Sequence, residues 1–133
     1  MGWMIDSNVF IAMERRGDVS DLSSWSGTED VHISVVTAAE LLMGVHRADN
    51  DVRRARRSAF VETILATIGI LDFNVEIARR HALLYSQLSK EGKMIGAHDL
   101  IIAATALHHS CRLLTDNVAE FRRVEGLEVV EFS

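Results

Sequence analysis

The sequence contains no proline, only one cysteine, and no long uncharged apolar run. The single thiol, Cys111, excludes an internal disulfide and is typical of a protein that works in a reducing cytosol. No segment approaches the roughly 20 apolar residues that cross a bilayer, and no signal peptide precedes the first apolar segment, so we expect a cytoplasmic protein. A formal net charge of −5 argues against coating of nucleic acid by bulk electrostatic attraction. That charge does not exclude a nuclease whose carboxylates are offset locally by metal ions.

What the sequence does contain is typical of a well-packed globular chain. Hydrophobic residues make up 48% of the 133 residues, and a chain of this length buries about two-thirds of the surface that its unfolded form exposes. We find no internal repeat, low-complexity tract or linker. The sequence therefore predicts a single domain covering residues 1–133.

Short apolar segments alternate with amphipathic helical segments along the chain. Residues 3–5 are apolar, end at Asp6 and lead directly into a helical pattern, which is typical of a short buried strand in a parallel sheet. Further strands are predicted at 31–36, 69–73, 112–115 and 127–132, the last one at an edge. The main helices are predicted at 8–15, from 37 onward, at 51–66, at 75–90 and at 97–107. The alternation predicts the α/β class.

Four acidic residues occupy equivalent places in this pattern, each where a strand gives way to a helix or a helix begins: Asp6, Glu40, Asp99 and Asp116. In a parallel sheet these junctions converge on one edge, where ligands bind. Each acid also has a local structural explanation. Glu40 has the capping-box spacing from Thr37, and Asp99 is favoured by the dipole of its helix. The convergence of all four favours a functional site over four separate caps.

Such a cluster of carboxylates points to a hard divalent cation. Two carboxylates about 5 Å apart repel by roughly 3 kcal/mol at an effective dielectric constant of about 20, so protonation or a cation must offset the charge. Ligands that are all oxygen atoms indicate Mg²⁺ or Mn²⁺ rather than zinc. The histidines also lack the spacing of a zinc site. Ser7 lacks the motif of a nucleophilic serine, and no glycine-rich phosphate loop follows a strand. The chemistry indicated is metal-assisted hydrolysis of a phosphodiester.

Four motifs together resemble the PIN-domain ribonucleases, and among them the VapC toxins of type II toxin–antitoxin pairs. They are Met4-Ile5-Asp6-Ser7-Asn8-Val9, Thr37-Ala38-Ala39-Glu40-Leu41 with Gly44, Gly96-Ala97-His98-Asp99-Leu100-Ile101-Ile102-Ala103-Ala104, and Leu114-Thr115-Asp116-Asn117 leading to Glu120-Phe121. The resemblance implies a three-layer α/β sandwich of about five mostly parallel strands with helices on both faces. It also implies a Mg²⁺-dependent endoribonuclease that forms a homodimer and is inhibited by a cognate antitoxin inserted into the active-site groove. We expect a structured RNA such as tRNA as the substrate.

The resemblance also assigns roles to the acids. Asp6 and Asp99 match the principal metal-binding positions, and Glu40 matches the middle acid. The fourth position falls on Asp116 or on its neighbour Asn117, and we prefer Asp116 because it carries a charge. The sequence departs from the family in having His98 beside Asp99, with Ala97 where a proline is common.

Two alternatives remain open at this stage. One is a non-catalytic binding module of the same fold that uses Arg53, Arg54, Arg56 and Arg57 as its contact surface, although these arginines also fit a solvated helix face. The other is a housekeeping nuclease in RNA processing with the same chemistry.

Overall fold

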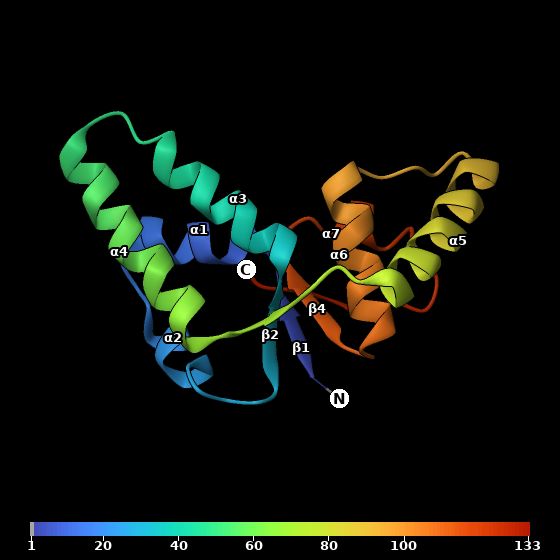
Figure 1. The fold of residues 1–133 in the computed structure, drawn as a ribbon, viewed down its shortest axis with the longest axis horizontal. Coiled ribbons are helices and arrows are strands. Elements are labelled where there is room, and N and C mark those ends of the chain that lie inside the picture. Colours follow the sequence, from blue (N-terminus) through green and yellow to red (C-terminus); the bar gives the residue numbers. More distant parts are fainter. Residues whose placement is uncertain (1) are drawn as a thin grey trace.

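A computed structural model describes residues 2–133, which form a central sheet of five parallel strands in the order β3-β2-β1-β4-β5 (Figure 1). The strands are β1 (Trp3–Ile5), β2 (Val31–Ser34), β3 (Gly69–Leu71), β4 (Arg112–Thr115) and β5 (Val129–Glu131). The helices are α1 (Ser7–Arg16), α2 (Ser20–Trp25), α3 (Val35–His46), α4 (Asp51–Thr67), α5 (Val75–Glu91), α6 (Ala97–His108) and α7 (Val118–Phe121). The predicted fold class is confirmed.

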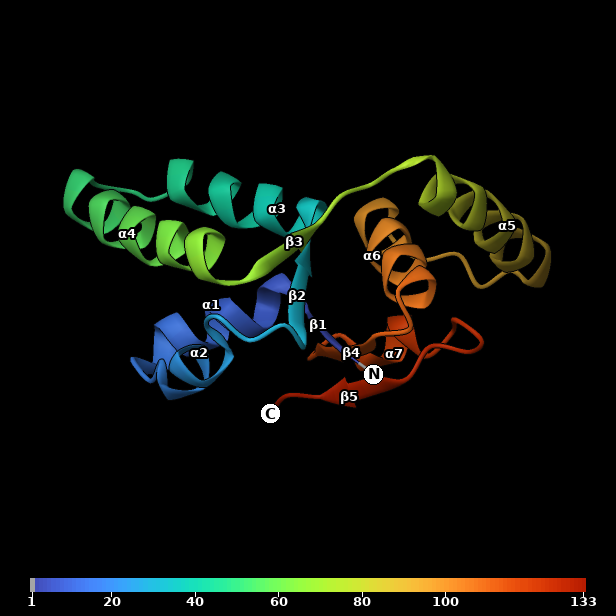
Figure 2. The same cartoon turned by 60° about the horizontal axis from the view of Figure 1, so that its bottom comes forward.

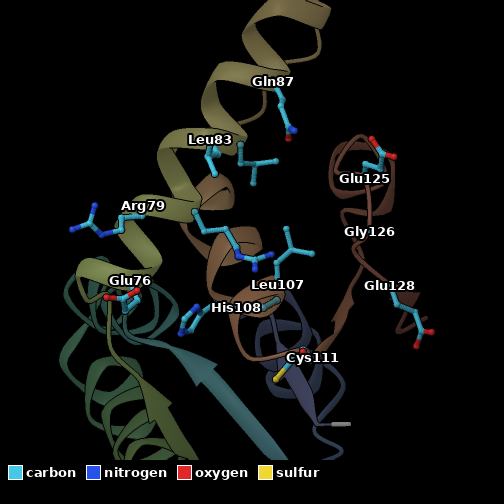
Figure 3. Close-up of a pocket in the computed structure, with 14 residues that line it drawn as sticks. Glu76, Arg79, Leu83, Gln87, Leu107, His108, Cys111, Glu125, Gly126 and Glu128 are labelled. Carbon is cyan, nitrogen blue, oxygen red and sulfur yellow. The ribbon is translucent and has the colours of Figure 1, made fainter.

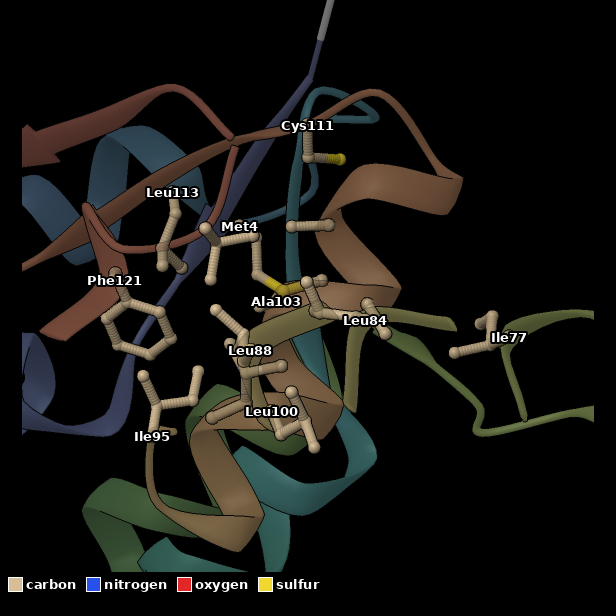
Figure 4. Close-up of a cluster of buried hydrophobic side chains, with 14 residues drawn as sticks. Met4, Ile77, Leu84, Leu88, Ile95, Leu100, Ala103, Cys111, Leu113 and Phe121 are labelled. Carbon is tan, nitrogen blue, oxygen red and sulfur yellow. The ribbon is translucent and has the colours of Figure 1, made fainter. Parts of the chain in front are cut away.

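Helices cover both faces of the sheet, and each face has its own apolar core. Figures 1 and 2 show α3 and α4 on one side of the strands and α5 and α6 on the other. Adjacent residues of β1 point to opposite faces, so Met4 packs with α5, α6 and α7 while Ile5 packs with α1, α3 and α4. Figure 4 shows the first of these cores, where Phe121 and Leu113 lie near Met4. The strands are therefore held in place on both sides.

The strand order places a point where the chain reverses direction between β1 and β4, and a ligand-binding crevice is expected at their carboxyl ends. The chain moves outward from β1 to β2 and β3, and then returns to the other side of β1 to form β4. At such a switch in direction, the connections that leave two neighbouring strands diverge and leave room for a ligand. Asp6 follows β1 and Asp116 follows β4, so this crevice lies where the sequence predicts the site.

The predicted boundary between β2 and α3 is wrong, and the error concerns Glu40. We predicted a strand over 31–36 and a helix capped by Thr37, but the strand ends at Ser34, whose hydroxyl accepts a hydrogen bond from Val36 N at 3.1 Å. Thr37 is therefore inside the helix and fully buried. Glu40 makes no capping box with Thr37, so its local structural explanation does not hold.

The arginines of α4 are largely engaged within the protein. Arg53 pairs with Asp49 at 2.9 Å, Arg54 with Asp51 at 2.7 Å, and Arg57 with Glu14 of α1 at 3.1 Å. Exposed pairs of this kind contribute only about 0–1 kcal/mol each, but they occupy the guanidinium groups. The contacts favour a solvated, internally paired helix face over a dedicated phosphate-binding surface.

None of the helices between residues 2 and 133 combines the length and apolar character that crossing a membrane requires.

Candidate active site

Asp6 is fixed at the end of β1 by neighbours on helix α1 and strand β4. It is the N-cap of α1, and its Oδ1 accepts a hydrogen bond from Ser7 N at 2.8 Å. Its Oδ2 accepts one from the hydroxyl of Thr115 at 2.8 Å and another from Asn8 Nδ2 at 3.3 Å. Thr115 is the last residue of β4, so the pairing of β1 with β4 sets the orientation of the carboxylate. Burial raises the pKa of Asp6; the hydrogen bonds from Thr115 and Ser7 oppose this, and the charges of Glu40 and Glu120 add to it.

Glu40 reaches the same place from the second turn of α3. Its Oε1 accepts a hydrogen bond from the hydroxyl of Ser7 at 3.3 Å, so Asp6 and Glu40 share Ser7 as a neighbour. Its Oε2 lies 3.5 Å from Nδ1 of His98 at the start of α6. Glu40 therefore bridges α1 and α6 at the mouth of the crevice.

Asp99 is the third residue of α6 and carries the largest pKa shift of the cluster. Its Oδ2 accepts a hydrogen bond from Asn117 Nδ2 at 3.2 Å. Burial, then the charges of Asp6 and Glu120, a hydrogen bond with Glu120 and the charge of Glu40 raise the pKa of Asp99 to about 7. A carboxyl group with such a pKa lies within a strong negative potential. The structure thus brings together three predicted acids that are far apart in the sequence.

Asp116 lies outside this cluster, contrary to our preference for it. Its Oδ1 accepts hydrogen bonds from the backbone N of Ser133 at 3.0 Å and from its hydroxyl at 2.9 Å, so the carboxylate is turned toward the C-terminal residue. The neighbouring Asn117 instead donates from one amide nitrogen to Asp99 and to Glu120, the latter at 2.8 Å. The reason is local geometry, because consecutive residues after a strand point in different directions, and charge alone does not determine which one faces the site.

Glu120 is the member of the cluster that our sequence prediction missed. It lies on α7, three residues after Asn117, and it also accepts a hydrogen bond from the backbone N of Gly96. The hydrogen bonds from Asn117 and Gly96 lower the pKa of Glu120, whereas the pKa of Asp99 is raised. The sequence signal for Glu120 was its spacing of three residues from Asn117, because residues one helical turn apart lie on the same side of a helix.

The donor set fits a hard divalent cation that keeps part of its water shell. Among residues 2–133, no three histidine, cysteine, aspartate or glutamate side chains are already arranged to hold one ion. Mg²⁺-like cations, however, usually bind one or two carboxylates and complete their shell with water and substrate phosphate. Burial and then the neighbouring carboxylate charges raise the pKa of Asp99, and a bound cation would offset both by stabilising the ionised form. Asp6 and Asp99 are therefore chemically suited to hold such a cation.

A cavity lies away from the acidic cluster. It has a volume of about 910 Å³ and lies between α5 and the segment around residues 125–128, with Arg79, Leu83, His108 and Cys111 among its lining residues (Figure 3). No residue of the acidic cluster lines it. The acidic cluster and this cavity are therefore separate features of the molecule.

Comparison with known proteins agrees with the fold and the acidic crevice. Residues 3–127 match the PIN domain, and this chain therefore belongs to the PIN domain family. Within that family it groups with the VapC ribonucleases. It is 41% identical to Ribonuclease VapC1 of Rickettsia felis, over 100% of this chain and 98% of the relative.

Two further similarities extend this grouping. The chain is 27% identical to the tRNA(fMet)-specific endonuclease VapC of Shigella flexneri, over 98% of each protein. Among solved structures it is similar to VapBC-5 of Mycobacterium tuberculosis, a member of the VapBC family of toxin–antitoxin systems, with a TM-score of 0.75 and 28% identity over 98% of this chain and 97% of the other. The resemblance inferred from the sequence motifs is confirmed.

Proposed function

We propose that this protein is a Mg²⁺-dependent endoribonuclease and the toxin of a VapBC-like type II toxin–antitoxin pair. The observation that carries the proposal is the convergence of Asp6, Glu40 and Asp99 on one crevice, with a pKa of about 7 at Asp99. The relatives named as ribonucleases cover the whole chain, which supports the reaction class. The name of the Shigella relative supports a tRNA substrate, and a cytoplasmic location follows from that substrate.

In this proposal Asp6 and Asp99 hold the metal, with Mn²⁺ as a possible substitute for Mg²⁺. When bound, Mg²⁺ supplies stabilisation of negative charge on a phosphate and a water of lowered pKa. Thr115 and Asn8 hold the Asp6 carboxylate in one orientation. Glu40 lies at the mouth of the crevice, where its carboxylate can accept a proton from the attacking water. Asn117 and Glu120 take the fourth position in place of Asp116.

An antitoxin segment would fit a groove beside Glu40. A cavity of about 180 Å³ lies between α1, α3 and α4, with Ile11, Leu41, Phe60 and Val61 as apolar lining and Glu14, Glu40 and Arg57 as charged lining. An apolar pocket with a few charged groups suits an inserted peptide side chain. Occupation of this groove would obstruct access to Glu40, which would account for inhibition.

Homodimer formation is part of the proposal as well. Helix α5 exposes three large side chains that a folded monomer does not bury: Val75 at 64%, Leu83 at 68% and Tyr85 at 54% exposure. Large exposed apolar side chains on one helix are groups that a second copy of the chain could cover.

Removal of divalent metal tests the proposed reaction directly. We expect the purified protein to cleave tRNA in Mg²⁺ and to lose cleavage in EDTA, because the carboxylates alone provide no group that stabilises phosphate charge. Addition of excess Mg²⁺ should restore the activity. Electrophoresis of tRNA incubated under each condition measures this. Undiminished cleavage in EDTA would overturn the metal-dependent mechanism.

Substitutions at Asn117 and Asp116 test which of the two residues takes the fourth position of the site. We expect Asn117→Ala to lower the cleavage rate by about 10- to 100-fold, because its amide orients Asp99 and Glu120. Asp116→Asn should change the rate by less than about threefold, as expected for a group outside the site. Initial rates in Mg²⁺, with thermal unfolding as a check on folding, measure both. An equal loss of cleavage rate in the two variants would show that Asp116 belongs to the site.

A further inference from the structure

We propose that His98 is a positioning residue that holds the carboxylate of Glu40 in its working orientation, an inference that rests on the proposed nuclease function. His98 is the second residue of α6, directly before Asp99, and its side chain is 50% exposed. Its Nδ1 lies 3.5 Å from Oε2 of Glu40. The two side chains come from different helices, so their contact joins α6 to α3 across the mouth of the crevice.

The two oxygens of Glu40 have different neighbours. Oε1 accepts the hydrogen bond from the Ser7 hydroxyl at 3.3 Å, and Oε2 faces His98. A glutamate side chain has three rotatable bonds, and fixing them costs conformational entropy. Contacts at both oxygens restrict the carboxylate more than either contact alone. Without His98, the Glu40 carboxylate could rotate while it keeps its hydrogen bond with the Ser7 hydroxyl.

Only Nδ1 of the imidazole faces the carboxylate, which determines the tautomer. A carboxylate oxygen can only accept, so Nδ1 carries the hydrogen in the contact, whether or not Nε2 is also protonated. A separation of 3.5 Å is slightly longer than a formed hydrogen bond, and catalytic contacts of this kind are often long before substrate binds. The half-exposed imidazole has room to close the distance.

This geometry predicts which substitutions of His98 preserve activity. The side-chain amide of asparagine places an N–H close to the position of Nδ1, whereas the longer glutamine places one close to Nε2. We therefore expect His98→Asn to retain cleavage within about threefold of the unchanged protein. His98→Gln and His98→Ala should lose about 10- to 100-fold, the usual loss when a supporting partner of a metal site is removed. The loss should be in kcat, with KM for RNA unchanged, because the residue acts through Glu40.

The test measures kcat and KM for tRNA cleavage in Mg²⁺ for the full chain and the three His98 variants. His46→Asn is the matched control, because His46 is exposed at the far end of α3 and should leave kcat unchanged. The inference is overturned if His98→Gln is as active as His98→Asn, if all three variants are fully active, or if only KM changes, which would make His98 an RNA contact. Absence of cleavage by the unchanged protein would instead overturn the proposed function.

A second measurement is independent of activity. Nitrogen-15 NMR of the imidazole should show the Nδ1–H tautomer at His98 in the unchanged protein at alkaline pH. In Glu40→Gln the side chain can present either an amide hydrogen or an oxygen to Nδ1, so the preference for this tautomer should weaken. An Nε2–H tautomer in the unchanged protein, or an identical spectrum in both proteins, would contradict the contact.

Discussion

Replacement of Asp99 by asparagine is expected to abolish RNA cleavage while leaving the protein folded. The substitution keeps the shape of the side chain and its hydrogen bond with Asn117, but it removes the charge proposed to hold the metal. We expect the cleavage rate in Mg²⁺ to fall by at least about 100-fold, beyond the loss caused by supporting residues. Expression of the unchanged protein in a host cell should arrest growth, and expression of Asp99→Asn should not.

The same substitution should not lower stability in the absence of metal. Burial and then the charges of Asp6, Glu120 and Glu40 oppose ionisation of Asp99 and raise its pKa to about 7, so a side chain that is always neutral avoids this cost. We expect the unfolding temperature of metal-free Asp99→Asn to equal or exceed that of the unchanged protein, as is common where a site is built at the expense of stability. Asp21→Asn is the matched control, because Asp21 is exposed in the first turn of α2, outside the acidic cluster. If Asp99→Asn kept normal cleavage, the assignment of Asp99 as a metal ligand would be wrong.

Binding of Mg²⁺ is expected to weaken steeply as the pH falls below about 7. A carboxyl group must lose its proton before it can bind a metal, and the pKa of Asp99 in the metal-free protein is about 7. Well below that value each pH unit should raise the apparent Kd for Mg²⁺ by about tenfold, so the change from pH 7, where half of Asp99 is already protonated, to pH 5 is about 50-fold. Calorimetric titration with Mg²⁺ at several pH values, in buffers of different ionisation enthalpy, measures both the affinity and the proton released.

Bound metal should remove the effect of Asp99 on the pH dependence of stability. In the metal-free protein the pKa of Asp99 is raised above its unfolded value, so the free energy of unfolding falls as the pH rises from about 4 to 7 and the contribution of this group is then constant. With saturating Mg²⁺ Asp99 is ionised in the folded protein, as it is in the unfolded chain above about pH 4, so this fall should disappear. A pH-independent Mg²⁺ affinity between pH 5 and 8 would show that Asp99 is not a ligand. His46→Asn serves here as a variant expected to leave the profile unchanged.

Sequence patterns predicted the layered α/β architecture because the local signals agreed with the tertiary structure. The helices predicted at 51–66 and 75–90 extend over Asp51–Thr67 and Val75–Glu91, since their apolar periodicity and their caps at Asn50 and Asn74 coincide. The main local error was at residues 34–37. Either Ser34 or Thr37 could have capped the helix by residue type, and burial of Thr37 in the core decided between them.

By itself, the sequence determined the fold class and the edge of the sheet at which Asp6, Glu40 and Asp99 would meet, because parallel strands deliver their carboxyl ends to one side. Only the tertiary structure decided the membership of the cluster and the pairing of its side chains. The adjacent Asp116 and Asn117 are separated by the direction in which each leaves β4, and Glu120 joins because α7 packs beside the start of α6. The physical reason is that the alternation of strands and helices along the chain follows from local periodicity, whereas the direction of a single side chain depends on contacts between residues that are distant in sequence.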